Sequence, residues 1–403
     1  MDNMINRIAE DMTKTSPEQM WAGFQYVAFA LYDEKLVYLF NHPNYPAVNE
    51  KPYCVLTRTD SFIAETLILF EGHPTAIANL SLHNDYEGLF STLVHELFHG
   101  YQYIKGEKRF PNELLGIMYP IQEENVEARN QERKALHDAF MADSREQMLH
   151  DLCRFIALRE KREELIGEAL EYENRIETVE GPAIYLEAKA KSLVSPLSFG
   201  KILEYYAAFL VDPYDSSFQL RRSCYYTGIF LSLILDKVAP AWKESFMETD
   251  KTLYAILKEA LFGQGLGLPE VKLSLSGESR NIVREILEKR EQGFDEFYKK
   301  PGTRVCILGE LTAKGIDPMN IIRHGDKLLH KHYLKVAISQ EEYLFKQPVV
   351  AFINKDYRQM KELHLILNNK PVETKESLIL DGIGEIKGTY KKKGDILYLY
   401  PKE

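Results

Sequence analysis

Apolar positions recur with a helical period through most of the first three quarters of the chain. Residues that repeat every three to four positions form one face of an α-helix. This pattern predicts helices over residues 178–193, 200–210, 222–238, 251–262 and 279–299. Pro240 and the glycine-rich stretch at 263–267 separate the later ones, since both residue types interrupt helices.

The first 84 residues combine one predicted helix with short strands. The helix is expected to begin at Pro17, with Ser16 as its cap, because proline suits the first position of a helix. Its apolar face would carry Trp21, Phe24 and Val27. Residues rich in β-branched and aromatic side chains then predict a short N-terminal sheet with strands over residues 53–56, 66–70 and 75–82.

Residues 121–173 form a long, charged segment of helical character that includes the run ENVEARNQERKALHDAF. Asp143 and Ser144 are interpreted as the turn and cap between two antiparallel helices. Such charge runs usually face solvent, so the charged residues are interpreted as a solvated helix face. This helical hairpin is expected to be an insertion within a helical region that spans residues 85–300.

The pattern changes after Pro301, where alternating segments rich in β-branched and aromatic residues predict strands. Residues 301–403 are therefore expected to form a separate, mostly β module. His330 and His332 stand two positions apart and would share one face of a strand. We expect this pair to be exposed rather than to bind a metal ion.

Composition and charge argue against several classes of protein. A formal net charge of −10 and the lack of a long basic run argue against nucleic-acid binding. The longest apolar run, residues 229–235, is too short to span a bilayer, and the N-terminus lacks the pattern of a secretory signal. Four scattered cysteines without a C-x-x-C pair predict neither a disulfide framework nor a cysteine zinc site. A reducing, cytoplasmic environment is therefore expected.

The sequence STLVHELFHGYQ at residues 91–102 contains an H-E-x-x-H motif, formed by His95, Glu96 and His99. Positions i and i+4 lie on the same face of a helix, so both imidazoles can reach one metal ion. Leucines, phenylalanines and a valine surround the motif and predict a buried helix, in which unpaired polar side chains would be costly. This spacing is typical of zinc metallohydrolases, in which the central glutamate is the general base.

A catalytic zinc usually has three protein ligands. The third cannot be the histidine of the extended motif H-E-x-x-H-x-x-G-x-x-H, because Gln102 and Lys105 occupy its glycine and histidine positions. A glutamate from a later helix is the common alternative. The stretch ETVEGPAIYLEAKA offers Glu180, whereas QEENVEARN offers Glu123, Glu124 and Glu127. The second stretch has a spacing similar to that of thermolysin-like enzymes, without the aspartate that usually follows such a ligand.

The first of these stretches resembles the gluzincins, in particular zinc aminopeptidases of the aminopeptidase N type and the wider peptidase-MA-like group. In that family an E-G-x-A-x-Y segment begins a helix and supplies the third ligand, and EGPAIY at residues 180–185 matches it. The resemblance implies that Glu180 is the ligand. The Gly181–Pro182 pair is expected to break the preceding helix so that a new one begins there. Glu180 lies 81 residues beyond His99, a longer connection than in these relatives, which the hairpin at 121–173 would fill.

Two further features bear on this resemblance. Aminopeptidase N relatives carry a Tyr-x-x-Gly helix whose tyrosine stabilises the oxyanion; Tyr225 with Gly228 matches it, and Tyr226 is the neighbouring alternative. Residues 75–82 are expected to be the edge strand of the active-site sheet, along which related peptidases bind extended substrates. The G-A-M-E-N string that holds the substrate amine in aminopeptidase N does not occur in the sequence.

These features together predict an α+β, zincin-like fold: a mainly α-helical catalytic domain with a short N-terminal β-sheet, plus a C-terminal, mostly β module. The predicted function is that of a zinc-dependent metallopeptidase, with Zn2+ bound by His95, His99 and Glu180 and with catalytic roles for Glu96 and Tyr225. Peptides or proteins are the expected substrates, with no nucleic-acid or membrane partner. Two alternatives stay open: a zincin-fold binding or scaffold protein without activity, and a zinc hydrolase of a non-peptide amide or ester.

Overall fold

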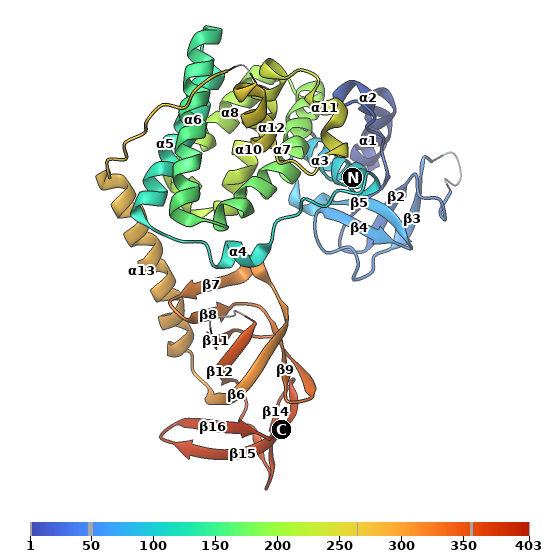
Figure 1. Cartoon of the computed structure of the whole chain (residues 1–403). Coiled ribbons are helices and arrows are strands. Elements are labelled where there is room, and N and C mark those ends of the chain that lie inside the picture. The colour runs from blue at the N-terminus through green and yellow to red at the C-terminus, as the bar shows by residue number, and fades with distance from the viewer. Residues whose placement is uncertain (1, 47–50, 264, 355–357, 403) are drawn as a thin grey trace. The chain divides into compact units, whose positions relative to one another are not determined.

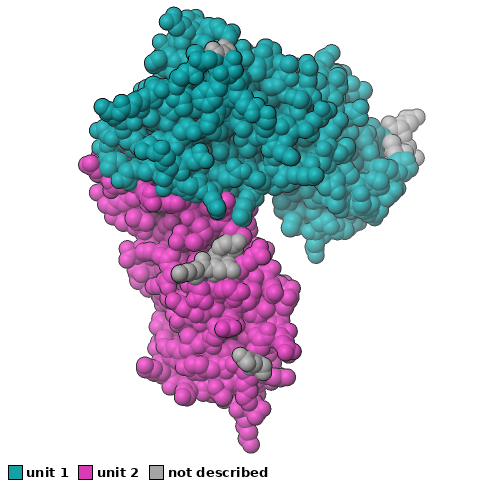
Figure 2. All heavy atoms as spheres, in the orientation of Figure 1, with its two compact units in different colours: residues 1–112, 124–275 teal, residues 113–123, 276–403 magenta. Residues whose placement is uncertain are grey.

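The computed structural model describes residues 2–46, 51–263, 265–354 and 358–402. The chain divides into two compact units, coloured separately in Figure 2: residues 1–112 and 124–275 form unit 1, and residues 113–123 and 276–403 form unit 2. Helices account for about 49% of the structure and strands for about 24%. The fold is therefore mixed α/β, with one sheet near the N-terminus and another near the C-terminus (Figure 1). No described helix is both long enough and apolar enough to cross a membrane.

The described part of unit 1 contains a five-stranded sheet in the order β3-β2-β1-β5-β4. β1 and β5 run parallel, and the other neighbouring strands are antiparallel. The strands are β1 (Ala28–Tyr32), β2 (Leu36–Phe40), β3 (Tyr53–Thr57), β4 (Thr66–Phe70) and β5 (His73–Asn79). The sequence pattern predicts the last three. β1 and β2 are continuous apolar runs, which do not distinguish a strand from a buried helix.

The expectation of an edge strand at residues 75–82 is wrong. β5 lies between β1 and β4, and a 3-10 turn follows it at Leu80–Leu82. Residues 76–78 are fully buried, as is typical of a strand that is covered on both faces inside a sheet. β4 is an edge strand instead.

The N-terminal helices are α1 (Asp2–Lys14) and α2 (Pro17–Met20). α2 is much shorter than the helix predicted to begin at Pro17, because Trp21 directly after it is extended, with φ −155° and ψ +130°. Trp21 lies beyond α2 and is nevertheless buried. It packs on Phe98, with ring centroids 5.1 Å apart, so the apolar spacing of this segment reflects tertiary packing rather than helix.

Most of unit 1 is helical. Its further helices are α3 (Tyr86–Ile104), α5 (Glu123–Met141, of which Glu123 belongs to unit 2), α6 (Arg145–Ile166), α7 (Ala169–Val194), α8 (Phe199–Val211), α9 (Pro213–Phe218), α10 (Leu220–Val238), α11 (Trp242–Ser245) and α12 (Leu253–Phe262). α7 continues through Gly181 and Pro182, so the expected helix break at this pair is wrong. Proline in a helix interior costs about 3 kcal/mol, and the burial of most of α7 outweighs that cost.

α5 and α6 form the predicted helical hairpin, and the Ser144 hydroxyl caps α6 by accepting a hydrogen bond from the Gln147 backbone N–H. Part of the charged surface of this hairpin is buried, however. Arg133, Arg159 and Arg162 are among the largest fully buried side chains of the protein. The interpretation of the charge run as a solvated helix face is therefore wrong for these buried side chains, although Lys134, Glu163 and Glu164 of the same helices are exposed.

Buried glutamates pair with two of these arginines, Arg159 and Arg162, across helix boundaries. Glu132 on α5 accepts hydrogen bonds from Arg159 at 2.5 Å and from Arg162 at 2.7 Å. On α7, Glu177 pairs with Arg159 at 2.5 Å, and Glu173 pairs with Arg162. Such pairing is needed because an isolated charge in a protein interior is very costly. The resulting network joins α5, α6 and α7, so the hairpin supports the helix that carries Glu180.

Unit 2 contains a second sheet, which has eleven strands among the described residues. Its main path is β13-β14-β15-β16-β6-β12-β11-β8-β7, and β9 pairs with β6 and with β10. The strands are β6 (Thr303–Ile316), β7 (Ile321–His324), β8 (Lys327–His330), β9 (Leu334–Ile338), β10 (Glu341–Phe345), β11 (Val349–Ile353), β12 (Gln359–Leu367), β13 (Val372–Glu373), β14 (Ser377–Leu380), β15 (Gly384–Lys393) and β16 (Ile396–Pro401).

Two helices, α4 (Glu113–Ile117) and α13 (Gly277–Lys299), belong to unit 2. The helical period of the sequence predicts that the segment of α13 belongs with the helices before it, in the region 85–300. In the structure Phe294 and Phe297 of α13 form an apolar cluster with Leu329 and Val350 of the sheet. This packing places the start of unit 2 before α13 rather than at residue 301.

His330 and His332 do not form an exposed pair, contrary to expectation. His330 ends β8 and is only 2% exposed, and neither of its ring nitrogens has a hydrogen-bond partner among the residues that the structure describes. His332 lies beyond the strand, with its Nδ1 3.0 Å from Asp317 Oδ2. Burial lowers the pKa of His330 to about 4, so this histidine is neutral at pH 7.

Candidate metal centre

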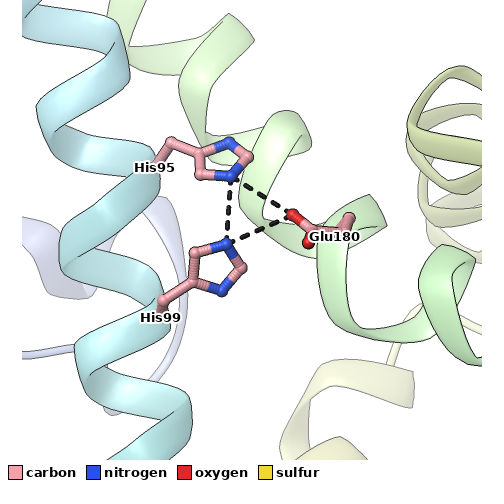
Figure 3. A group of neighbouring side chains, drawn as sticks. All are labelled: His95, His99 and Glu180. Carbon is pink, nitrogen blue, oxygen red and sulfur yellow. Dashed lines mark hydrogen bonds and ion pairs between the residues drawn. The ribbon is translucent and has the colours of Figure 1, made fainter. Parts of the chain in front are cut away.

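The two histidines of the H-E-x-x-H motif lie on α3, which is buried along most of its length. The Asp85 carboxylate caps this helix by accepting a hydrogen bond from the Gly88 N–H at 2.6 Å. One turn separates His95 from His99, and both side chains point from α3 toward Glu180 on α7 (Figure 3). Residues far apart in the sequence are thereby brought to one place.

Three possible ligand atoms meet at this point. His95 Nε2 and His99 Nε2 are 3.0 Å apart, and they lie 3.4 Å and 3.2 Å from Glu180 Oε2. Three ligands of a tetrahedral zinc, at bond lengths of about 2.0–2.2 Å, are separated from one another by roughly 3.3 Å. The triangle formed by the two nitrogens and the oxygen has this size.

Hydrogen bonds to Nδ1 of each imidazole determine which ring nitrogen can bind a metal ion. His95 Nδ1 lies 3.0 Å from Glu187 Oε2, and His99 Nδ1 lies 2.7 Å from Gln102 Oε1. The Gln102 amide N–H donates to the Val179 carbonyl at 2.8 Å, which leaves its oxygen facing His99. Both Nδ1 atoms therefore donate, and both Nε2 lone pairs are available to a cation.

The carboxylate of Glu180 is oriented through its other oxygen, which lies 3.2 Å from Arg221 Nη2. Burial raises the pKa of Glu180, but the imidazoles of His99 and His95 outweigh burial and hold this pKa well below its ordinary value. Burial lowers the pKa of His95, whereas Glu180 and Glu187 hold it well above its ordinary value. Both pKa shifts come from the attraction between the imidazoles and the carboxylates, so positive charge is stabilised beside Glu180.

The donor set fits a zinc ion. Two imidazoles and one carboxylate are common ligands of catalytic zinc, which keeps a fourth position for water. Each imidazole is also held through its Nδ1 by a further side chain, as ligating histidines usually are. The chemistry and the spacing of these three residues therefore agree.

Glu96 stands between the two histidines in the sequence and is 8% exposed. Burial raises the pKa of its carboxyl group, and the nearby His99 and His95 lower it only in part, so the pKa is raised overall. A carboxylate of raised pKa beside a cation site is suited to accept a proton and to release it again.

Tyr225 on α10 lies beside the same cluster. Its ring is nearly parallel to that of His95, with centroids 6.4 Å apart, and burial followed by interaction with Glu180 raises the pKa of its phenol. The Tyr226 hydroxyl instead accepts a hydrogen bond from Arg222 Nε at 2.8 Å. The α10 helix thus presents Tyr225 to the site and turns Tyr226 to another neighbour.

α7 and α10 approach each other closely at a pair of glycines. A Cβ atom on Gly228 would lie 2.6 Å from Gly181 Cα, and a Cβ atom on Gly181 would lie 2.7 Å from Gly228 Cα. Neither position can hold a side chain without moving a helix. Glu180 precedes Gly181, and Tyr225 is almost one turn before Gly228, so this crossing brings the two functional candidates together.

The alternative candidates for the third ligand lie elsewhere. Glu124 is exposed, and Glu123 lies 3.6 Å from Arg280, a residue of unit 2. Glu127 is buried and accepts a hydrogen bond from the Gln131 amide at 2.8 Å. Of the four glutamates considered, Glu180 is the one whose carboxylate lies beside both histidines.

Sequence reasoning missed three residues that hold the cluster: Glu187, Gln102 and Arg221. Glu187 follows Glu180 by seven residues, and Gln102 follows His99 by three, so each shares a helix face with a candidate ligand. This spacing could have identified both of them. Arg221 comes from α10, and no spacing in the sequence relates it to the other helices.

Comparisons with known proteins found no match to this chain. No family model matches the chain, and neither the curated proteins nor the solved structures that were searched contain a match.

Proposed function

We propose that the chain is a zinc-dependent metallopeptidase whose unit 1 has a zincin-like fold. The proposal rests above all on one observation: two imidazole nitrogens and a carboxylate oxygen, all oriented by further side chains, lie within 3.4 Å of one another. A non-enzymatic scaffold would need neither this donor set nor Glu96 beside it.

Each residue has a role that its surroundings support. Zinc, when bound, supplies a Lewis acid that lowers the pKa of a water ligand to about 7. Glu96 accepts a proton from the nucleophilic water and delivers it to the leaving amine. Tyr225 donates a hydrogen bond to the oxyanion that develops on the scissile carbonyl. Its raised pKa keeps the phenol protonated, as a donor must be.

The sheet of unit 1 supports a peptide as the substrate. β4 is an edge strand of this sheet, and edge strands bind extended peptides through main-chain hydrogen bonds. α3, which carries the histidines, packs against both β4 and β5, so a peptide added to β4 would extend the sheet on which this helix lies.

Cleavage of a peptide library, read by mass spectrometry, tests this proposal. The zinc-loaded wild type should cleave peptides, and a chelator should abolish cleavage until zinc is restored. Glu96→Gln should keep its zinc and lose nearly all turnover, because an amide cannot accept the proton. Glu124→Gln, which changes an exposed glutamate, is the matched control and should leave turnover unchanged. Cleavage that persists with the chelator or in Glu96→Gln would show that the proposal is wrong.

A further inference from the structure

A second group of metal-ligating side chains lies in unit 2, on neighbouring strands of its sheet. Cys306 on β6 is directly opposite His364 on β12, and Glu362 stands two residues before His364. Because side chains alternate along a strand, these three share one face of the sheet. The opposite face carries the apolar core residues Val305, Ile307, Leu363 and Leu365.

The three side chains are already in contact. The Cys306 thiol donates to Glu362 Oε1 at 3.2 Å, and the same oxygen lies 2.6 Å from His364 Nε2. All three possible ligand atoms lie within 4.8 Å of one another. Ligands of one tetrahedral zinc are roughly 3.3–3.8 Å apart, so small outward movements of the side chains would admit an ion.

The cluster is partly exposed to solvent, and one of its side chains, His364, is hydrogen-bonded to a tyrosine. Cys306 is buried, whereas the side chains of Glu362 and His364 are 26% and 24% exposed, which leaves a path for an ion. His364 Nδ1 lies 2.8 Å from the Tyr298 hydroxyl. A phenol can accept as well as donate a hydrogen bond, so Tyr298 can hold the His364 ring with Nε2 directed to a metal.

A comparable group in unit 1 shows what distinguishes this cluster. Glu173, Glu177 and Cys224 also bring possible ligand atoms together, but buried arginines already pair with both carboxylates. In unit 2, Glu362 bonds to the thiol and the imidazole, while its neighbour Lys361 pairs with Asp326 at 3.2 Å. The carboxylate in unit 2 is therefore not neutralised in the same way.

We propose that Cys306, Glu362 and His364 form a second site for a transition-metal cation of the zinc class, with solvent as a further ligand. A thiolate, an imidazole and a carboxylate together suit zinc or cobalt rather than magnesium or calcium. The ion would link β6 to β12 within unit 2. This site is independent of the centre on α3 and α7.

Metal binding at this site must release a proton. A free cysteine thiol is protonated at neutral pH and binds a metal ion as the thiolate. Formation of the metal–sulfur bond breaks the S–H bond, and the proton passes to solvent. Affinity should consequently rise as the pH is raised.

Titration of the full chain with Co2+ tests the proposal, because a thiolate ligand gives a charge-transfer band in the near ultraviolet. The centre formed by His95, His99 and Glu180 contains no sulfur and cannot produce this band. The wild type should develop it with one thiolate-bound cobalt per chain. Cys306→Ser should abolish the band, and Cys54→Ser, which changes another free cysteine, should leave it intact.

Two further variants distinguish loss of this site from misfolding and from cobalt binding at another cysteine. His364→Asn changes a partly exposed side chain and should also abolish the band. Tyr298→Phe should weaken cobalt binding by about 10–100-fold, as the loss of a residue that orients a ligand usually does. Absence of the band in the wild type overturns the proposal, as does a band that survives Cys306→Ser or His364→Asn.

Discussion

The close crossing of α7 and α10 provides a sharp test of how the candidate centre is assembled. Gly228→Ala adds a single methyl group at the crossing. That methyl would lie 2.6 Å from Gly181 Cα and 2.8 Å from the Glu177 carbonyl oxygen. Carbon atoms in favourable contact are about 3.5–4.0 Å apart, so the helices must separate locally by about 1 Å.

The expected cost follows from this overlap. Overpacking of a well-packed interior costs about 1–3 kcal/mol. For a unit of this size each kcal/mol lowers the melting temperature by about 2–4 °C, so Gly228→Ala should melt about 2–12 °C below the wild type. A shift of about 1 Å between Tyr225 and Glu180 should also reduce turnover about 10²-fold. Zinc should be retained, since its proposed ligands lie on α3 and α7.

Thermal unfolding and zinc content, measured on the same preparations, check these values. Gly200→Ala is the matched control, because a Cβ there would have its nearest neighbour at 4.0 Å. In that variant the higher helix propensity of alanine should leave the melting temperature unchanged or raise it. A Gly228→Ala protein that melts at or above the wild-type temperature would refute the reasoning, since the two helices would then not be in close contact.

Three other predictions concern single side chains. Glu187→Gln should weaken zinc binding by about 10–100-fold in competition with a chelating dye; unchanged affinity would mean that Glu187 does not orient His95. Tyr225→Phe should reduce kcat by about 10²–10³-fold, with Tyr226→Phe as the control, and the reverse pattern would assign the role to Tyr226. His330 has a pKa of about 4 when folded and an ordinary value of 6.5, so only the unfolded chain gains its proton between these pH values. The free energy of unfolding of the wild type should therefore fall by about 2 kcal/mol more than that of His330→Leu between pH 8 and pH 5. Denaturant unfolding measures both free energies, and an equal fall in the two proteins would contradict this prediction.

The sequence predicts many helices and several strands because their apolar periods are local properties. α8, α10, α12 and α13 begin and end within two residues of the predicted bounds. α3 likewise places His95 and His99 one turn apart, as the motif spacing requires. The resemblance to gluzincins predicts Glu180 as the third ligand, and its carboxylate lies beside both imidazoles. Spacing in the sequence alone also allows Glu123, Glu124 or Glu127 as that ligand.

The errors concern partners that are distant in the chain. A run of arginines and glutamates is solvated or buried according to what another helix offers, and Glu173 pairs with an arginine 44 residues before it. Whether β5 is an edge or an interior strand depends on β1, which occurs more than 40 residues earlier. Gly181 and Pro182 predict a helix break when they are considered alone. In the structure Gly181 instead allows the close approach of Gly228 on α10, a contact that the local sequence does not reveal.

Zinc content per chain is the most direct test of the central proposal, measured in a Cys306→Ser background so that the second site does not contribute. After reconstitution and removal of excess metal, this protein should hold one zinc. Glu180→Gln in the same background should bind zinc much more weakly, whereas Glu124→Gln should not differ from the parent. A protein that holds no stoichiometric zinc, or one that keeps its zinc equally well after Glu180→Gln, would contradict the assignment of His95, His99 and Glu180 as a metal centre.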